Sequence, residues 1–319
     1  MSINPRKVVI IGDGMVGSAV AYTFVNKKSV RDLVIIDVNK DKAEGDALDM
    51  NHAMSLSTPM NIKAGNYYDI SDARIIIITA GAAQKPGETR IDLLNKNRRI
   101  FDSIFDNMRP YLNMESIVLV LTNPVDLLSL YTYQNLGLPA NQVIGSGTVL
   151  DTARLKYLLS KDTGIDPRNI HTYVVGEHGD SELAAYSVTS IGGINISEYC
   201  RKCNRCQGRR LEQLDDIEEE VINSAYEIIQ KKGSTYYGIA MATYRIVEAI
   251  IDDTKSILTV SSYISNGLDG RIDGVYLSVP SVVSSKGVEK TIWPNYSLEE
   301  QDSLIESAMK LKTLSESIE

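Results

Sequence analysis

The sequence predicts an α/β protein in which a doubly wound parallel sheet is followed by an α+β lobe. In the first half, short runs rich in Val, Ile and Leu alternate with segments long enough to form helices. Most of these runs are apolar throughout, which is typical of strands covered by helices on both faces. The strand candidates are residues 7–11, 33–37, 61–64, 74–79, 116–122 and 142–144. Regular alternation of strand and helix favours a parallel sheet.

The second half has a different pattern. A final helix is expected to begin near Ser297, because Glu300 three residues later completes a capping-box pattern. The other expected elements are helices at 211–231 and 236–251 and strands at 170–175, 184–189, 256–264 and 275–284. Because 319 residues exceed the size at which one core usually keeps growing, we expect two closely packed domains, 1–145 and 146–319.

Composition excludes several classes of partner. The 33 basic and 41 acidic residues give a net charge of −8, and no Lys/Arg block is present, so neither nucleic acid nor an anionic membrane is expected to bind. The apolar runs have strand length, so we expect no signal peptide and no membrane span. Three cysteines provide no disulfide framework, which fits a reducing, cytoplasmic compartment.

A glycine-rich turn follows the first strand candidate. Its sequence is Gly12-Asp13-Gly14-Met15-Val16-Gly17, and a helical segment comes next. In this pattern the first glycine permits a tight turn, the second lets the backbone approach a pyrophosphate, and the third lets the helix pack closely on the strand. The open N–H groups of the helix N-terminus then face the phosphates. The turn therefore predicts a Rossmann-type dinucleotide site.

An acidic residue sets the choice of dinucleotide. Asp37 ends the second strand candidate, twenty residues after Gly17. A carboxylate there can accept hydrogen bonds from the adenine ribose and would repel a 2′-phosphate. We therefore expect NAD(H) rather than NADP(H).

A histidine between glycines is the main candidate for chemistry. His178 follows an expected strand and stands between Gly176 and Gly179 with Glu177, so backbone can approach a ligand closely there. Upstream, Asp151 and Arg154 are three residues apart and share one helix face. Taken alone, that pair is equally typical of a surface salt bridge.

Together with the fingerprint, these segments resemble the L-lactate/L-malate dehydrogenase family. The matching segments occur in the family's order from residue 8 to beyond residue 240. They are 12–17, 81–90, 121–126, 145–154, 174–181 and 231–238. The resemblance implies NAD-dependent interconversion of a 2-oxo acid and an L-2-hydroxy acid by a homo-oligomer, usually a dimer or tetramer.

The resemblance also implies roles for individual residues. His178 is similar to the family's proton donor, which acts as a base in the reverse direction, and Asp151 to the aspartate that orients it. Arg154 resembles the clamp for the substrate carboxylate, because a guanidinium offers two parallel donors to a planar anion. Arg90 resembles the loop arginine that polarises the substrate carbonyl.

Other family positions have competing structural explanations. Asn123 is similar to the asparagine that contacts the nicotinamide ribose and the substrate, but it could also cap a helix. Thr235 and Ile239 match positions that line the substrate pocket and the nicotinamide face, but ordinary packing would explain them too. His52 has no identifiable partner and is interpreted as structural.

Gln84 decides between substrates. In malate dehydrogenases the corresponding position resembles an arginine, which pairs with the second carboxylate of oxaloacetate. A neutral amide would leave that carboxylate unpaired, which is costly in a site without water. Pyruvate is therefore favoured. Malate or a branched-chain acid remains the enzymatic alternative, and a non-catalytic NAD-binding protein is the alternative from another class.

Two features are left over. Cys200, Cys203 and Cys206 form a C-x2-C-x2-C pattern, but a fourth ligand for zinc or an iron–sulfur cluster is missing nearby, so no metal is expected. Bacterial members of the family often bind fructose 1,6-bisphosphate through an arginine and a histidine. The matching positions are Lys156 and His171, so the allosteric site is only half matched, since lysine lacks bidentate geometry.

Overall fold

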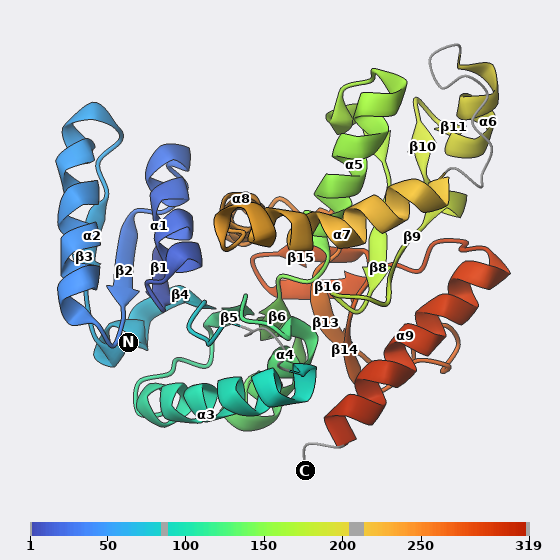
Figure 1. Cartoon of the computed structure of the whole chain (residues 1–319). Helices are drawn as coiled ribbons and strands as arrows, with labels where there is room; N and C mark the ends of the chain where they lie inside the picture. The colour runs from blue at the N-terminus through green and yellow to red at the C-terminus, as the bar shows by residue number, and fades with distance from the viewer. Residues whose placement is uncertain (1, 84–88, 204–213, 317–319) are drawn as a thin grey trace.

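The computed structural model describes residues 2–83, 89–203 and 214–316; for Arg90 and Asp215 it describes the backbone alone. The first half alternates strands and helices, as predicted (Figure 1). In chain order its elements are β1 (Asn4–Ile11), α1 (Met15–Lys27), β2 (Asp32–Ile36), α2 (Lys40–His52), η1 (Ala53–Leu56), β3 (Asn61–Ala64), η2 (Tyr67–Asp72), β4 (Ala73–Ile78), α3 (Arg90–Met108), β5 (Ile117–Val120), α4 (Val125–Leu136), η3 (Ala140–Gln142) and β6 (Val143–Gly145).

These six strands form a parallel sheet in the order β3-β2-β1-β4-β5-β6. The order reverses between β1 and β4, and in such sheets ligands bind at the carboxyl ends of the strands beside that point. Each expected strand is present to within a few residues. The predicted doubly wound sheet is thus confirmed.

Both faces of this sheet are covered, and β1 shows how. Val8 and Ile10 belong to a core with α1, α2 and α8, whereas Val9 and Ile11 belong to a second core with α3, α4 and α9. Successive side chains of a strand point to opposite faces, so an apolar run is needed to fill two cores. The tetrapeptide Ile75–Ile78 in β4 is accordingly 0% exposed.

The second half is a mixed α+β region. Its elements are α5 (Val149–Thr163), η4 (Pro167–Asn169), β7 (Ile170–His171), β8 (Val174–Gly176), β9 (Glu182–Ala184), η5 (Tyr186–Val188), β10 (Ser190–Ile191), β11 (Ile194–Asn195), α6 (Ile196–Lys202), α7 (Leu214–Lys232), α8 (Tyr237–Ile251), β12 (Ser256–Leu258), β13 (Ser261–Ile264), β14 (Val275–Ser278), β15 (Ser281–Ser284), β16 (Gly287–Thr291) and α9 (Leu298–Glu316). Antiparallel β13, β14, β8 and β9 extend the first sheet to ten strands. Two three-stranded sheets, β11-β10-β7 and β12-β15-β16, complete the described strands.

Several strand predictions in this half were wrong in detail. The run 184–189 holds only the end of β9, because the chain turns into η5, where the Thr189 hydroxyl donates to the Ala185 carbonyl at 2.8 Å. The run 170–175 is divided between two sheets, β7 in one and β8 in another. The run 275–284 breaks at Pro280, which has no N–H for a ladder. At each break the chain leaves one sheet and enters another. A hydrophobic pattern predicts strands but not the sheet to which each strand belongs.

The run 256–264 also breaks, into β12 and β13. At the break, the Thr259 carbonyl accepts the Thr148 amide at 3.1 Å. A Cβ on Gly147, whose φ is +53°, would lie 2.7 Å from that same carbonyl oxygen. The segment before α5 therefore packs directly against the β12–β13 corner. Within the described residues, no helix has both the length and the apolar character needed to cross a membrane.

The predicted capping box of the last helix is confirmed. The Ser297 hydroxyl accepts the Glu300 amide at 3.1 Å, and the Glu300 carboxylate accepts the Ser297 amide at 2.9 Å. Leu304, Ala308 and Leu311 then bury one side of α9.

Replacing Ser297 by Ala should lower the free energy of unfolding by about 1 kcal/mol, because one cap hydrogen bond is lost. Ser303→Ala, at an exposed position of the same helix, should change it by less than about 0.5 kcal/mol. Urea unfolding followed by circular dichroism measures both. Equal losses in the two variants would contradict a capping role for Ser297.

Candidate active site

The glycine-rich turn after β1 is too crowded for other residues at two positions. Gly12 has a φ of +107°, and a Cβ there would lie 2.4 Å from the Ala80 amide nitrogen. A Cβ on Gly17 would lie 1.9 Å from the Gly12 carbonyl oxygen. Because neither glycine has a Cβ, β1, β4 and α1 can approach one another closely at the carboxyl end of the sheet.

The N-terminus of α1 is open. Gly14 is its N-cap, and the helix has neither a side-chain cap nor an acidic residue in its first turn. Met15, the first helical residue, is 56% exposed, and Val16 follows it. Uncapped N–H groups and the positive end of the helix dipole suit a phosphate anion. The turn therefore fits the pyrophosphate of a dinucleotide.

Asp37 follows β2 with its carboxylate held in place. One oxygen accepts the Asp13 amide at 2.5 Å, and the other accepts the Asn39 amide at 2.8 Å. Each oxygen has a second lone pair, so the carboxylate can still accept hydrogen bonds from ribose hydroxyls. Its position at the end of β2 fits the predicted ribose contact.

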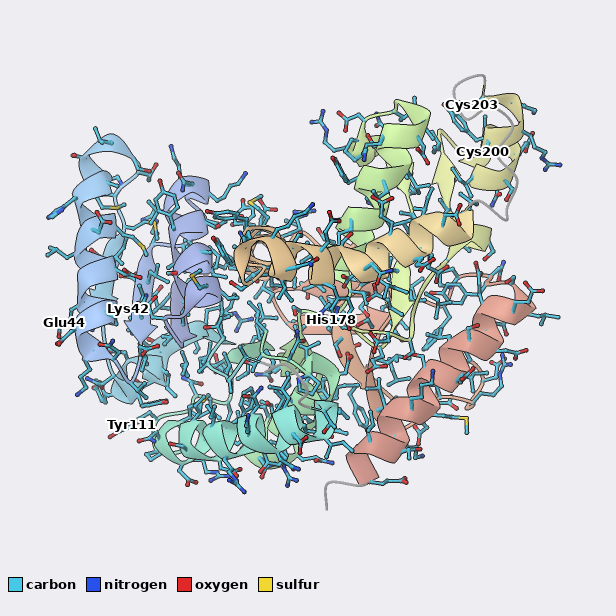
Figure 2. All side chains as sticks on the ribbon, viewed as in Figure 1. Lys42, Glu44, Tyr111, His178, Cys200 and Cys203 are labelled. Carbon is cyan, nitrogen blue, oxygen red and sulfur yellow. The ribbon has the colours of Figure 1, made fainter. Side chains whose placement is uncertain are left out.

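Sequence analysis assigned no role to the side chain of Asp13. It is 1% exposed, and Lys42 in the first turn of α2 lies 3.0 Å from its carboxylate and 2.7 Å from Asp46 (Figure 2). Burial raises the pKa of Asp13 to about 6, against the opposing effect of Lys42. The ion pair between Asp13 and Lys42 connects the glycine-rich turn to α2. In the sequence, the only sign of such a role for Asp13 was its charge, between two glycines.

His178 lies in the connection between β8 and β9, at the centre of the molecule in Figure 2. Its backbone amide donates to Asp126 at 2.8 Å, and the other oxygen of Asp126 accepts the Ser261 hydroxyl at 2.5 Å. Asp126 is 3% exposed and belongs to the first turn of α4. Burial raises its pKa to about 6, although both hydrogen bonds oppose this effect. α4 thus fixes the backbone of the histidine.

The side chain of His178 is held by α5. Its Nδ1 lies 2.8 Å from one oxygen of Asp151, a residue that is 1% exposed. The other oxygen of Asp151 pairs with the guanidinium of Arg154 one helical turn later. Asp151 and Arg154 share a helix face, as predicted. With Nδ1 directed to the carboxylate, Nε2 is the ring nitrogen left for a substrate.

The charges around His178 favour its protonated form. Burial disfavours the imidazolium, but the carboxylate of Asp151, helped by Glu182 and Asp126, raises the pKa of His178 to about 9. Burial raises the pKa of Asp151, but His178 and Arg154 outweigh this effect and lower it. The charges around the ring thus favour an imidazolium at the wall of a cavity.

The cavity is a pocket of about 180 Å³. Four predicted site residues line it, and they come from three different segments of the chain. Its lining is Leu93, Asn123, Pro124, Asp151, Arg154, His178, Gly179, Asp180, Glu182, Ile222, Ala225, Tyr226 and Ile229. Besides apolar groups and three acids, the lining holds an imidazole, a guanidinium and an amide, which suit a small anion with a polar oxygen.

Other predicted residues lie elsewhere or cannot be placed. Gln84 is outside the described residues, and Arg90 begins α3 with an undescribed side chain. Thr235 lies in the α7–α8 connection and is not among the described residues that line the pocket. Ile239 packs against the core that contains β1. His52 ends α2 and is exposed.

The remaining candidates that the structure describes do not line the pocket. Lys156 is half-buried in α5, where burial lowers its pKa, and His171 is exposed in β7. Cys200 and Cys203 lie on α6 and at its C-cap, well away from His178 (Figure 2). Cys206 is outside the described residues.

Sequence analysis also missed two buried acids near His178. Asp126 belongs to the run 121–126 that was matched to the family, and Glu182 comes four residues after His178. The signal was weak, since an acid next to an apolar strand is equally typical of a surface turn. Only the folded contacts show that both approach the histidine.

Comparison with known proteins agrees with the predicted fold. The model for the lactate/malate dehydrogenase NAD binding domain matches residues 6–145, and the model for the alpha/beta C-terminal domain of the same family matches residues 148–319. An L-lactate dehydrogenase of Thermoanaerobacterium saccharolyticum is 52% identical over 90% of this chain and 90% of its own. L-lactate dehydrogenase 1 of Clostridium acetobutylicum is 49% identical over 98% and 97%.

Solved structures give the same result. The ligand-bound minor L-lactate dehydrogenase of Enterococcus mundtii has a TM-score of 0.93 at 40% identity, with 98% of each chain covered. A lactate dehydrogenase from a Medee basin deep-sea metagenome has a TM-score of 0.92 at 41% identity, with the same coverage. With both domain models matched in sequence and the fold shared throughout, the chain belongs to the NAD-dependent lactate/malate dehydrogenase family.

Proposed function

We propose that this protein is an L-lactate dehydrogenase, which interconverts pyruvate and L-lactate with NAD(H). The observation that carries the proposal is the group His178, Asp151 and Arg154 at one small pocket. The names of the similar proteins support the choice of lactate. The dinucleotide would be held by the turn 12–17 and by Asp37, and when bound it would supply or accept the hydride.

In this proposal His178 donates the proton that the substrate oxygen takes up. Hydride addition to the keto carbon converts the carbonyl oxygen into an alkoxide, which takes a proton from Nε2 of the imidazolium. In the reverse direction the neutral ring takes the hydroxyl proton back. Asp151 on Nδ1 keeps the ring in the orientation that aims Nε2 at the pocket, and its charge stabilises the imidazolium.

The carboxylate of the substrate would bind Arg154. A guanidinium has five N–H donors, so its pairing with Asp151 leaves donors for a second anion. Asn123 lines the same pocket and would contact the substrate oxygen and the nicotinamide ribose. Arg90 would polarise the carbonyl, and Thr235 would border the substrate. The roles of Arg90 and Thr235 rest on the family resemblance.

The choice of pyruvate over oxaloacetate rests on Gln84. The alternative is another L-2-hydroxy acid, malate or a branched-chain one. NADH oxidation with pyruvate, oxaloacetate and 2-oxoisocaproate in parallel separates these enzymes. NADH binding with no turnover of any of the three would instead favour a non-catalytic NAD-binding protein.

The proposal extends to the setting of the enzyme. We place it in the cytoplasm, in glycolysis and fermentation, as a homotetramer. Fructose 1,6-bisphosphate is its proposed activator, bound by Lys156 and His171 at a contact between subunits.

Replacing Gln84 by Arg should move preference toward oxaloacetate, because it supplies a cation for the second carboxylate. A charge-assisted hydrogen bond corresponds to about 10-fold to 100-fold in relative kcat/KM. Gln84→Met, which has similar length and no charge, is the control and should not favour oxaloacetate. If the ratio of kcat/KM values stays at the wild-type level in the Arg variant, residue 84 does not face the substrate.

His178→Asn should lower kcat by roughly 100-fold to 10,000-fold, because the proton donor is lost. NADH affinity, followed by fluorescence, should stay unchanged, since the turn 12–17 lies apart from the histidine. Asp151→Asn should also slow turnover.

In the double variant the two losses should be far from additive, because both act on one proton transfer. Fully additive losses would mean that Asp151 works somewhere other than on His178. Wild-type kcat in His178→Asn would overturn the mechanism.

Fructose 1,6-bisphosphate should lower the KM for pyruvate modestly, since a lysine replaces the usual arginine and binds phosphate as a point charge. His171→Ala should abolish the effect, whereas inorganic phosphate at the same ionic strength should not reproduce it. Activation that persists in His171→Ala would rule out this site.

A further inference from the structure

Glu182 is a buried acid that the proposed reaction leaves unused. It is the first residue of β9, and it pairs in register with Gly176 of β8, two residues before His178. The hairpin brings its carboxylate oxygen to 3.8 Å from Nδ1 of His178. The residue is 7% exposed and lines the same pocket.

The other acids of this hairpin are engaged elsewhere. The Glu177 carboxylate accepts a hydrogen bond from the Ser181 hydroxyl at 2.5 Å. The Glu177 backbone amide donates to the hydroxyl of Ser307 in α9. Asp180 accepts the hydroxyl of Tyr226 of α7 at 3.0 Å. Glu182, by contrast, lies within ion-pair distance of His178.

The neighbours of Glu182 are both acidic and basic. Asp151 and Arg154 approach it from α5, and His178 from its own hairpin. On α7, Glu218 accepts the Ala184 amide at 3.0 Å, on the same strand. Asp126 faces His178 from α4. Three of these acids, Asp151, Glu182 and Asp126, lie near the imidazole of His178, and each favours its charged form.

We propose that Glu182 is a positioning residue for His178, a second carboxylate that holds its imidazolium form together with Asp151. Glu182 does not reach the reacting atoms in this account, because it lies toward Nδ1, the ring nitrogen that faces the protein. Its effect is on the pH at which the proton donor is lost. The inference deepens the proposed function and rests on it for its kinetic consequence.

The electrostatics of the two side chains support this role. Burial and the charge of Asp151 raise the pKa of Glu182 to about 8, against the effects of His178 and Arg154. The pKa of His178 is about 9. A carboxylate 3.8 Å from Nδ1 stabilises the imidazolium when it is ionised, and this delays the deprotonation of His178. Because the pKa of Glu182 is itself raised, its negative charge is weaker at lower pH, where it would otherwise repel an anionic substrate.

The test is Glu182→Gln, which keeps size and polarity and removes the charge. Pyruvate reduction needs protonated His178, so kcat/KM is full at low pH and falls as pH rises through the pKa of His178. Without the second carboxylate the pKa of His178 should drop. The alkaline limb of the pH profile of kcat/KM should then move to lower pH by roughly one unit. Lactate oxidation, which needs neutral His178, should begin at correspondingly lower pH.

Two variants separate charge from packing. Glu182→Asp keeps the charge and should restore the limb toward its wild-type position. Glu177→Gln changes a buried acid of the same hairpin that faces Ser181 and should leave the limb in place. The proposal would be overturned if the alkaline limb of the kcat/KM profile did not move in Glu182→Gln, or if it moved equally in Glu177→Gln.

A direct titration separates this inference from the proposed function. The chain has only three histidines, so the ring signals of His178 can be assigned by nuclear magnetic resonance with His178→Asn as reference. The pKa of His178 should be lower in Glu182→Gln than in the wild-type chain, whether or not pyruvate is the substrate. An unchanged pKa refutes the role of Glu182, whereas a lowered pKa in a protein that does not reduce pyruvate refutes the proposed function alone.

Discussion

Asp151 stands between two cationic side chains, with one carboxylate oxygen toward His178 and the other toward Arg154. At 1% exposure this carboxylate has almost no contact with water, so its charge is stable only while those partners compensate it. The dependence is mutual, because the imidazolium and the guanidinium are oriented by the acid they share. The proposed proton donor, His178, and the proposed carboxylate clamp, Arg154, are therefore set at a fixed spacing by one buried group before any substrate binds.

The fold supplies Asp151 by continuing one sheet through both halves of the chain. β6 ends the parallel part, and α5 begins four residues later while β13 takes the next place in the sheet. The Thr148 hydroxyl donates to the Val174 carbonyl at 2.5 Å, and the Thr152 hydroxyl accepts the Val174 amide at 2.9 Å. These bonds attach the start of α5 to β8, so a helix that follows the first half reaches a histidine that follows β8.

This arrangement explains which features could be predicted from the sequence. The parallel strands and the dinucleotide turn depend on local patterns, such as the apolar run of β4 and the spacing of Gly12 and Gly17, and both were predicted. The acids around His178 depend on contacts between distant segments. Asp126 is 52 residues from His178 along the chain, and its other partner, Ser261, is 135 residues from Asp126. Hydrophobic periodicity carries no information on such pairs, and for the same reason it did not show where the run 170–175 passes from one sheet to another.

The charges of the site also account for how it could serve two directions of one reaction. Arg154 and the imidazolium of His178 are the two cationic groups at a pocket that Asp151, Asp180 and Glu182 also line, and both cations attract a carboxylate. Once His178 has given up its proton, one of the two cations is lost, and the attraction for the anion weakens. The oxidised dinucleotide, when bound, would add a positive charge at its nicotinamide and so favour the binding of an anion such as L-lactate. Because burial and the charge of Asp151 raise the pKa of Glu182, its carboxylate opposes this attraction less at neutral pH than a fully ionised acid would.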